Sequence, residues 1–190
     1  WKMSGTKTFI TRGSVGSVFV IMAVTSPEKK QRGITAFLVE KGTPGFRTGR
    51  VLEKMGLHAS DTAELILEDV RLADSQRLGE IDHGFIDTLR ILDKGRITIG
   101  SMALGLGRGA YEAARRYARE RRQFGKALAD FQAIQNMLAS SATELEAARL
   151  LLRRAAWMHD QGQKITLVAS MAKLYAAQAA MRACDRAVQI

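Results

Sequence analysis

The three histidines and the one cysteine, which could carry metal or nucleophilic chemistry, are widely spaced in this chain. His58, His83 and His159 lack the spacing that a metal site requires. Cys184 is the single cysteine and lies in an apolar helical context, which argues against a disulfide framework and suits a reducing compartment. No motif supports Ser-His-Asp chemistry. The sequence therefore predicts no metal centre and offers no supported catalytic triad.

Three further functions can be considered from the composition: polyanion binding, nucleotide binding and membrane insertion. The sequence supports none of them further. Lys and Arg number 29 against 19 Asp and Glu, a formal charge of +10 that could attract a polyanion. The basic residues are spread among acids on predicted helices, so solvated helix faces are the plainer explanation. Residues 105–107, GLG, fall inside a predicted helix and form no nucleotide-binding fingerprint. No apolar run reaches the roughly 18 residues of a membrane span.

The elements that must position any functional residue begin with a β-rich segment over residues 1–75. Its short β-prone runs cover residues 8–11, 18–24, 34–39 and 63–67. Pro27 and Pro44, the two prolines of the chain, lie in turns between these runs, where proline and glycine favour chain reversals. Because no helix-length segment intervenes to make parallel crossovers, the pattern predicts an antiparallel sheet or a small barrel.

After Gly79 the pattern changes to helix and stays helical. We predict three long helices, over about 84–119, about 130–161, and from near Ile165 to Ile190, where no C-cap signal appears. Packing stripes are predicted on the second helix (Ile134, Leu138, Ser141, Leu145, Ala148, Leu152) and on the third (Leu167, Met171, Leu174, Met181, Val188). Four glycines of the first helix would let a neighbour approach closely: Gly100, Gly105, Gly107 and Gly109.

Several motifs follow one another in a fixed order over essentially the whole chain. Residues 5–11 are GTKTFIT, and residues 117–126 are YARERRQFGK. The first resembles the flavin-facing G-x-K-x-W-I-T strand of the acyl-CoA dehydrogenase family, and the second matches the family's Y-A-x-x-R-x-x-F-G turn. The remaining matches are GITAFLV at 33–39, KMGL at 54–57, ASDTAEL at 59–65, LDKGR at 92–96 and FQ at 131–132.

This resemblance implies an α+β fold, with an antiparallel β-domain followed by long antiparallel helices of an incomplete four-helix bundle. We therefore expect residues 1–78 to form the middle β-domain and residues 79–190 a truncated C-terminal helical domain. It also implies FAD as cofactor, acyl-CoA as substrate, electron-transfer flavoprotein as partner, and a homotetramer or homodimer. We expect no membrane partner and no nucleic-acid partner. The expected compartment is the cytoplasm in a bacterium or archaeon and the mitochondrial matrix in a eukaryote.

The resemblance assigns cofactor contacts to both halves of the chain. On the first strand, Phe9, Ile10 and Thr11 would face the flavin, with the Thr11 hydroxyl and the adjacent backbone near flavin N5; an ordinary strand threonine is the plain alternative. Phe9 replaces the usual Trp, which keeps an apolar ring but loses an N–H donor. Arg12 replaces a common Asn, and nothing in the sequence explains that change.

In the second half, the resemblance assigns contacts that reach the FAD of a neighbouring subunit. Arg121 would pair with the pyrophosphate, because a guanidinium fork matches phosphate oxygens; a solvated arginine is the alternative. Phe124 would pack on the cofactor, or serve as a helix-connecting core residue. The other expected cofactor contacts in this half are Gln123, Gln132 and Gln189.

Asp93 and Arg96 are the substrate-binding residues that the resemblance implies, since this segment borders the acyl-CoA site in the family. They lie three residues apart on one helical face, so a salt bridge worth a few tenths of a kcal/mol is the plain alternative. The family's base is a Glu, which a minority of members carry at the position of Gly95. We therefore expect no catalytic residue in this chain, the base beyond Ile190, and no activity from residues 1–190 alone. A DNA-associated binding protein of the same fold and an acyl-CoA oxidase are the alternatives.

Overall fold

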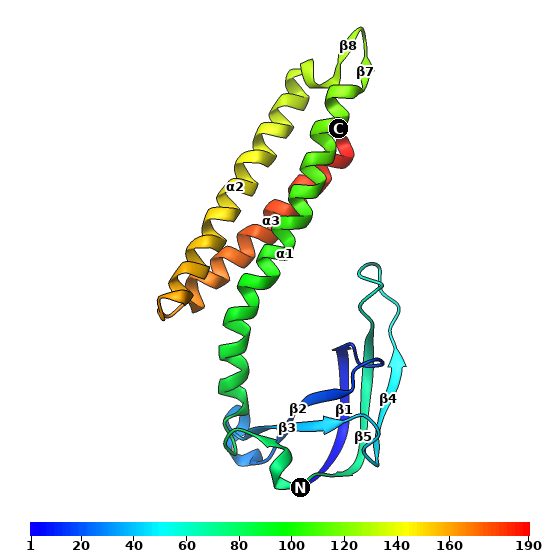
Figure 1. Cartoon of the computed structure of the whole chain (residues 1–190), viewed down its shortest axis with the longest axis vertical. Helices are drawn as coiled ribbons and strands as arrows, with labels where there is room; N and C mark the ends of the chain where they lie inside the picture. The colour runs from blue at the N-terminus through cyan, green and yellow to red at the C-terminus, as the bar shows by residue number, and fades with distance from the viewer. The chain divides into compact units, whose positions relative to one another are not determined.

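The computed structural model describes all 190 residues and divides them into two compact units, Trp1–Leu89 and Arg90–Ile190 (Figure 1). The first unit holds antiparallel sheets and the second holds long helices, which confirms the predicted α+β fold. The division between the units falls inside the first long helix, between Leu89 and Arg90. The predicted boundary after residue 78 marks instead the change from strand to helix, and it stays a prediction.

Six strands build the first unit as two three-stranded sheets. They are β1 (Lys2–Thr11), β2 (Val18–Val24), β3 (Ile34–Glu40), β4 (Phe46–Val51), β5 (Thr62–Arg71) and β6 (Arg77–Leu78). One sheet has the order β1-β5-β4 and the other β2-β3-β6, with every pairing antiparallel. The sequence did not predict β4 or β6, because β4 contains Gly49 and two arginines and β6 has only two residues.

The two sheets share one apolar core, and successive side chains of a strand alternate between this core and the surface. On β2, Phe19 and Ile21 are buried while Val18 and Val20 are exposed. Phe37 of β3 is 1% exposed and packs edge-to-face against the Trp1 ring, with the ring centroids 5.2 Å apart. This core fixes the position of β1, whose C-terminal end carries the predicted flavin-facing residues.

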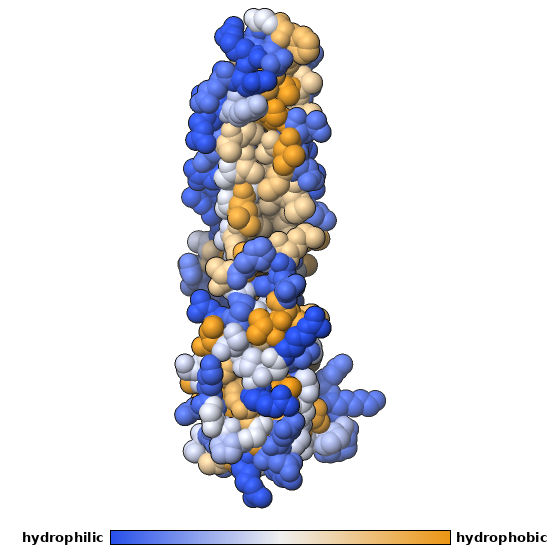
Figure 2. Space-filling model, turned by 90° about the vertical axis from the view of Figure 1, so that its right-hand side faces the viewer, coloured by the Kyte–Doolittle hydropathy of each residue, from blue (hydrophilic) through white to orange (hydrophobic).

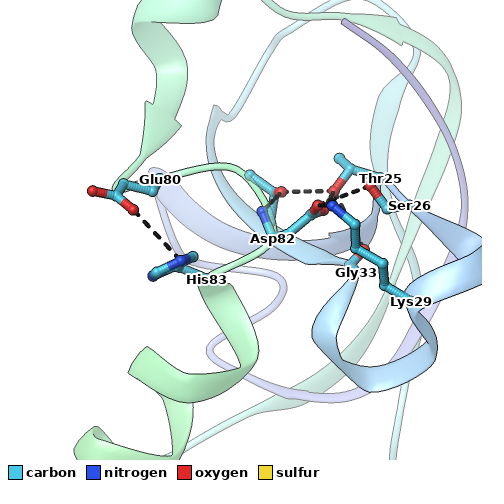
Figure 3. Close-up of polar contacts among 8 residues, drawn as sticks. Thr25, Ser26, Lys29, Gly33, Glu80, Asp82 and His83 are labelled. Carbon is cyan, nitrogen blue, oxygen red and sulfur yellow. Dashed lines mark hydrogen bonds and ion pairs between the residues drawn. The ribbon is translucent and has the colours of Figure 1, made fainter.

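A network centred on Asp82 ties the segment that precedes the first helix to the turn after β2 (Figure 3). The Asp82 carboxylate accepts hydrogen bonds from Thr25 Oγ1 at 2.7 Å and Ser26 Oγ at 2.9 Å. Lys29 Nζ, from the 3-10 helix η1 (Pro27–Arg32), forms an ion pair with it at 2.7 Å. The Asp82 N–H donates to the hydroxyl of the fully buried Thr35. These bonds hold Asp82, whose φ is 69°, in a conformation that is uncommon for a non-glycine residue.

Acid is expected to weaken the first unit through Asp82. Its pKa is lowered to about 2, first by the hydrogen bond from Lys29 and then by that from Thr25. A folded-state pKa below the unfolded value of about 3.9 stabilises the fold above that value, and this stability is lost as pH falls toward about 2. Asp82→Asn should therefore lower stability at pH 7 and flatten the loss between about pH 5 and pH 2.

The measurement is urea unfolding at several pH values in a Trp157→Phe background, where Trp1 emission reports the first unit. Lys29→Met is a second variant: it removes the largest cause of the lowered pKa but leaves both hydroxyls, so it should flatten the pH profile only in part. An acid dependence as steep in Asp82→Asn as in the unsubstituted chain would show that other carboxylates govern this transition.

Three helices make up most of the second unit and lie within a few residues of their predicted ranges. They are α1 (Gly84–Glu120), α2 (Gln132–Asp160) and α3 (Thr166–Gln189). A short hairpin and the 3-10 helix η3 (Leu128–Asp130) connect α1 to α2, and residues 161–165 connect α2 to α3. None of these helices has the length and apolar content that crossing a membrane requires.

Two of the four α1 glycines for which we predicted a close helix approach do make one. A Cβ on Gly100 would meet Leu152 Cδ2 at 2.7 Å, and a Cβ on Gly107 would meet the Ala180 Cα at 2.8 Å. Gly105 and Gly109 face open space, so the prediction was wrong for them. Close approach at Gly100 and Gly107 offsets the roughly 1 kcal/mol of helix propensity that each glycine loses relative to Ala.

The buried face of α3 is made of alanines, which corrects the predicted stripe. Its buried residues are Ala169, Ala172, Ala176, Ala179, Ala180 and Ala183. The predicted residues Leu167, Met171, Leu174, Met181 and Val188 are instead 52–89% exposed. Small side chains let α3 approach α2 and α1 closely, and the large side chains of α3 lie on its exposed face. Figure 2 shows a lengthwise apolar band on the helical unit, bordered by hydrophilic residues. On α2, by contrast, Ser141, Leu145, Ala148 and Leu152 are buried as predicted.

Candidate functional site

The C-terminal end of β1 carries a β-bulge that the sequence did not reveal. The pairing of β1 with β5 shifts register between Lys7 and Ile10, and Phe9 within the shift has a φ of 57°. Its side chain is 76% exposed. Bulges re-aim side chains, and a positive φ in an aromatic residue costs on the order of 1–3 kcal/mol. The structure thus presents the Phe9 ring outward at the place where the resemblance puts the flavin.

Ile10 and Thr11 line a groove of about 380 Å³ that β2 also lines through Val18 and Val20. Ile10 is half-buried and packs against the core, so it positions the strand end whether or not it meets a ligand. Thr11 is exposed and pairs with Thr62 of β5. The Thr11 hydroxyl and its neighbouring backbone are therefore open to a ligand at the strand end.

Asp61 anchors the chain immediately after Thr11. The Arg12 N–H donates to the Asp61 carbonyl at 2.9 Å, and the Ser14 N–H donates to its carboxylate at 2.8 Å. The Ser14 backbone N–H is the main cause that lowers the pKa of Asp61. Asp61 therefore positions the chain at the end of β1. Arg12, with a φ of 58°, turns the chain here, but nothing in the structure explains why Arg replaces Asn.

The turn after α1 is a two-residue hairpin between β7 (Arg122–Gln123) and β8 (Lys126–Ala127). Its central residues, Phe124 and Gly125, have φ values of 54° and 84°, which is the pattern of a type I′ turn. Gly125 adopts this conformation without strain, whereas Phe124 is a strained outlier. The Phe124 side chain is 92% exposed, so the alternative of a helix-connecting core residue is wrong.

The other predicted cofactor contacts also lie at this end of the helical unit. The Arg121 side chain is exposed and its guanidinium makes no ion pair within the chain. Gln123 belongs to β7, and Gln132 is the exposed first residue of α2. Gln189 lines a groove of about 580 Å³ between α1 and α3, together with Tyr117. Exposed amides, one unpaired guanidinium and one exposed ring are the groups that can hold a dinucleotide. Their roles stay predictions.

Asp93 and Arg96 form the predicted ion pair near the other end of the unit. Arg96 NH1 donates to Asp93 Oδ1 at 2.5 Å, and the side chains are 36% and 21% exposed. The other carboxylate oxygen accepts a hydrogen bond from Thr166 at the start of α3. Sequence patterns did not suggest Thr166, because 73 positions separate it from Asp93. The pair is therefore held between two helices.

The predicted substrate pair and the predicted cofactor hairpin are far apart within the helical unit. From Asp93 to the end of α1 at Glu120 the helix rises about 40 Å, at 1.5 Å per residue. One copy of this unit therefore cannot bring Arg96 and Arg121 to the same small ligand. Two copies could, if the hairpin of one reached the ligand beside the other.

The chain contains no cluster of possible metal ligands. No group of three or more His, Cys, Asp or Glu side chains is arranged to hold a metal ion. Gly95 is half-buried on α1 with open space around its Cα, so this position offers no general base. The residues brought to the two candidate regions bind and position; none of them is placed as a base.

Two family models match the chain in succession. One described as the acyl-CoA dehydrogenase middle domain matches residues 1–70, and one described as the acyl-CoA dehydrogenase C-terminal domain matches residues 82–190. Together they cover most of the chain and follow the same order as its strand-rich and helical units.

Relatives with the same architecture carry several related functions. The caffeyl-CoA reductase-Etf complex subunit CarC of Acetobacterium woodii is 44% identical over 188 residues, 99% of this chain and 50% of that protein. The butyryl-CoA dehydrogenase structure from Megasphaera elsdenii matches with a TM-score of 0.96 and 41% identity over 99% of this chain and 49% of that one. The prolyl acyl carrier protein oxidase AnaB matches with a TM-score of 0.94 and 34% identity, covering 98% and 49%. The chain spans about half the length of the curated relatives it matches.

Proposed function

The chain belongs to the acyl-CoA dehydrogenase family, and we propose from this premise that the whole protein oxidises acyl-CoA thioesters at Cα–Cβ with FAD. The observation that carries the proposal is the pair of outward-aimed aromatic residues, Phe9 and Phe124, each held at a positive φ at a position that the family motifs assign to the flavin. Backbone strain of this kind clusters at ligand-binding sites, and this motivates the proposal.

The residues present fit FAD. Thr11 offers a hydroxyl and backbone groups at the end of β1, and the unpaired Arg121 guanidinium can form a bidentate contact with a pyrophosphate. When bound, FAD accepts the hydride from the substrate Cβ. Phe9 and Phe124 would each shield part of a bound FAD from water, and Arg96, held by Asp93, would orient the acyl-CoA.

The α-proton requires a base, which suits a carboxylate in a water-excluded site, where burial raises its pKa. Because Gly95 occupies the only family base position within residues 1–190, we propose that a Glu outside this range supplies the base. Residues 1–190 by themselves are then expected to show no turnover.

We further propose a homo-oligomer, with the homotetramer as first choice, in which the hairpin of one subunit completes the site of another. The 40 Å rise of α1 between Asp93 and Glu120 supports this arrangement. An electron-transfer flavoprotein is proposed as the electron acceptor; the name of the Acetobacterium woodii relative, which is a subunit of an Etf complex, supports this choice.

Anaerobic titration of the whole protein with a panel of saturated acyl-CoAs tests the function. We expect a short acyl-CoA such as butyryl-CoA to bleach the oxidised flavin absorbance. A bound flavin that no acyl-CoA reduces would overturn the dehydrogenase proposal and favour a binding protein. An acyl-CoA oxidase is the second candidate, because AnaB, an oxidase by name, shares the architecture. Rapid reoxidation of the substrate-reduced flavin by air would favour it.

A further inference from the structure

Asp93 is held by two partners that use different oxygens of its carboxylate. Oδ1 accepts from Arg96 NH1 at 2.5 Å within α1, and Oδ2 accepts from Thr166 Oγ1 at 2.6 Å. The second bond comes from another helix. An ion pair three residues apart on one helix is ordinarily weak and free to change rotamer. Because each oxygen of the Asp93 carboxylate accepts a hydrogen bond, the carboxylate is held in one orientation. The Arg96 guanidinium that donates to it is therefore held in one orientation as well.

The start of α3 makes the contact with Asp93 favourable in a second way. Ile165 at the N-cap position provides no side-chain cap, and the first turn of α3 contains no acid. The Asp93 carboxylate on α1 therefore supplies negative charge beside the positive N-terminal end of α3. Ile165 is 6% exposed, so this end of α3 is anchored in the unit and Thr166 is held in place.

We propose that Thr166 is a positioning residue for the acyl-CoA site, which acts through Asp93 to fix the direction of the Arg96 guanidinium. This inference rests on the proposed function, in which Arg96 contacts the acyl-CoA. Arginine carries five N–H donors, and only one of those on Arg96 is used by Asp93. Holding the guanidinium in one direction leaves the remaining donors pre-aimed at the phosphate or carbonyl oxygens of a CoA thioester.

Kinetics of three variants of the whole protein test the proposal. Thr166→Val keeps the shape but removes the hydroxyl, and we expect KM for the reducing acyl-CoA to rise about 3- to 10-fold, as for loss of one hydrogen bond to a charged group. Thr166→Ser keeps a hydroxyl and should restore KM to within about twofold. Thr143→Val is the matched control, because the Thr143 hydroxyl bonds only the Ala139 carbonyl of its own helix. Its KM should not change.

A double-mutant cycle separates positioning from stability. In an Arg96→Ala background, Thr166→Val should add no further rise in KM, because its effect acts through Arg96. A further rise of the same size in that background would overturn the proposal. Provided that acyl-CoA reduces the flavin of the parent protein, equal KM values for Thr166→Val and Thr143→Val would also overturn the proposal. This holds even if Thr166→Val lowers the unfolding midpoint, because that change would show a structural role alone. A parent whose flavin no acyl-CoA reduces would overturn the proposed function and this inference together.

Discussion

Arg96→Ala and Arg121→Ala are each expected to lower acyl-CoA turnover by about 100-fold, and subunits of the two variants assembled together should recover about a quarter of the parent activity. Arg121→Ala should act through FAD affinity, measured at limiting FAD, because it removes a bidentate charge-assisted contact with the pyrophosphate. Arg96→Ala should act through kcat/KM for the acyl-CoA.

The recovery follows from the proposed shared site. In that site Arg96 and Arg121, which lie near opposite ends of about 40 Å of helix, come from different subunits. When the two variants pair at random, half of the pairs are mixed, and each mixed pair contains one site with both arginines intact. One site in four, or about a quarter of the total, is then complete.

Co-expression with two different tags allows the mixed assemblies to be isolated, and Thr143→Val co-expressed with Arg121→Ala supplies the control for mixing itself. If mixed assemblies are no more active than the two variants measured apart, each site is built by one chain. That result would overturn the shared site while leaving the dehydrogenase chemistry open to its own test.

The sequence predicts those elements whose periodicity and breakers agree. β2 begins and ends at the predicted residues because seven consecutive apolar residues are bounded by turn signals. The three helices follow from the absence of proline after Gly84. On α2, four of the six residues of the predicted stripe are buried, and Ile134 and Leu138 are only half-buried. The α+β order of the fold follows from the single change in pattern after Gly79.

What the sequence did not reveal depends on packing between distant residues. The spacing of Leu and Met on α3 is typical of a core stripe, but the buried residues of α3 are alanines. Small side chains occupy this face because they allow the helices to pack closely. The bulge at Phe9 leaves no local signal, since FIT is an ordinary strand sequence. The Thr166 contact joins two helices over 73 positions, and no periodicity within either helix encodes it.

Phe124→Asn is expected to stabilise the hairpin and to weaken FAD binding at the same time. Asn-Gly is the preferred pair for a type I′ turn, so the substitution relieves a positive φ of 54° that costs a Phe on the order of 1 kcal/mol. Amide exchange in the β7–β8 hairpin should slow about fivefold, the equivalent of that free energy. Loss of the ring, which is 92% exposed in this chain, should weaken FAD binding about tenfold.

Phe124→Leu separates the two effects, because it removes the ring but keeps the strained φ. Its FAD affinity should fall as in Phe124→Asn, while its hairpin amides should exchange no more slowly than in the parent. Hydrogen exchange without FAD and a flavin fluorescence titration supply the two measurements. If Phe124→Asn slows amide exchange in the hairpin but binds FAD as tightly as the parent, FAD binding does not require the strained Phe124. If it weakens FAD binding and slows exchange, a local conformation that opposes folding is retained because the bound cofactor needs the ring there.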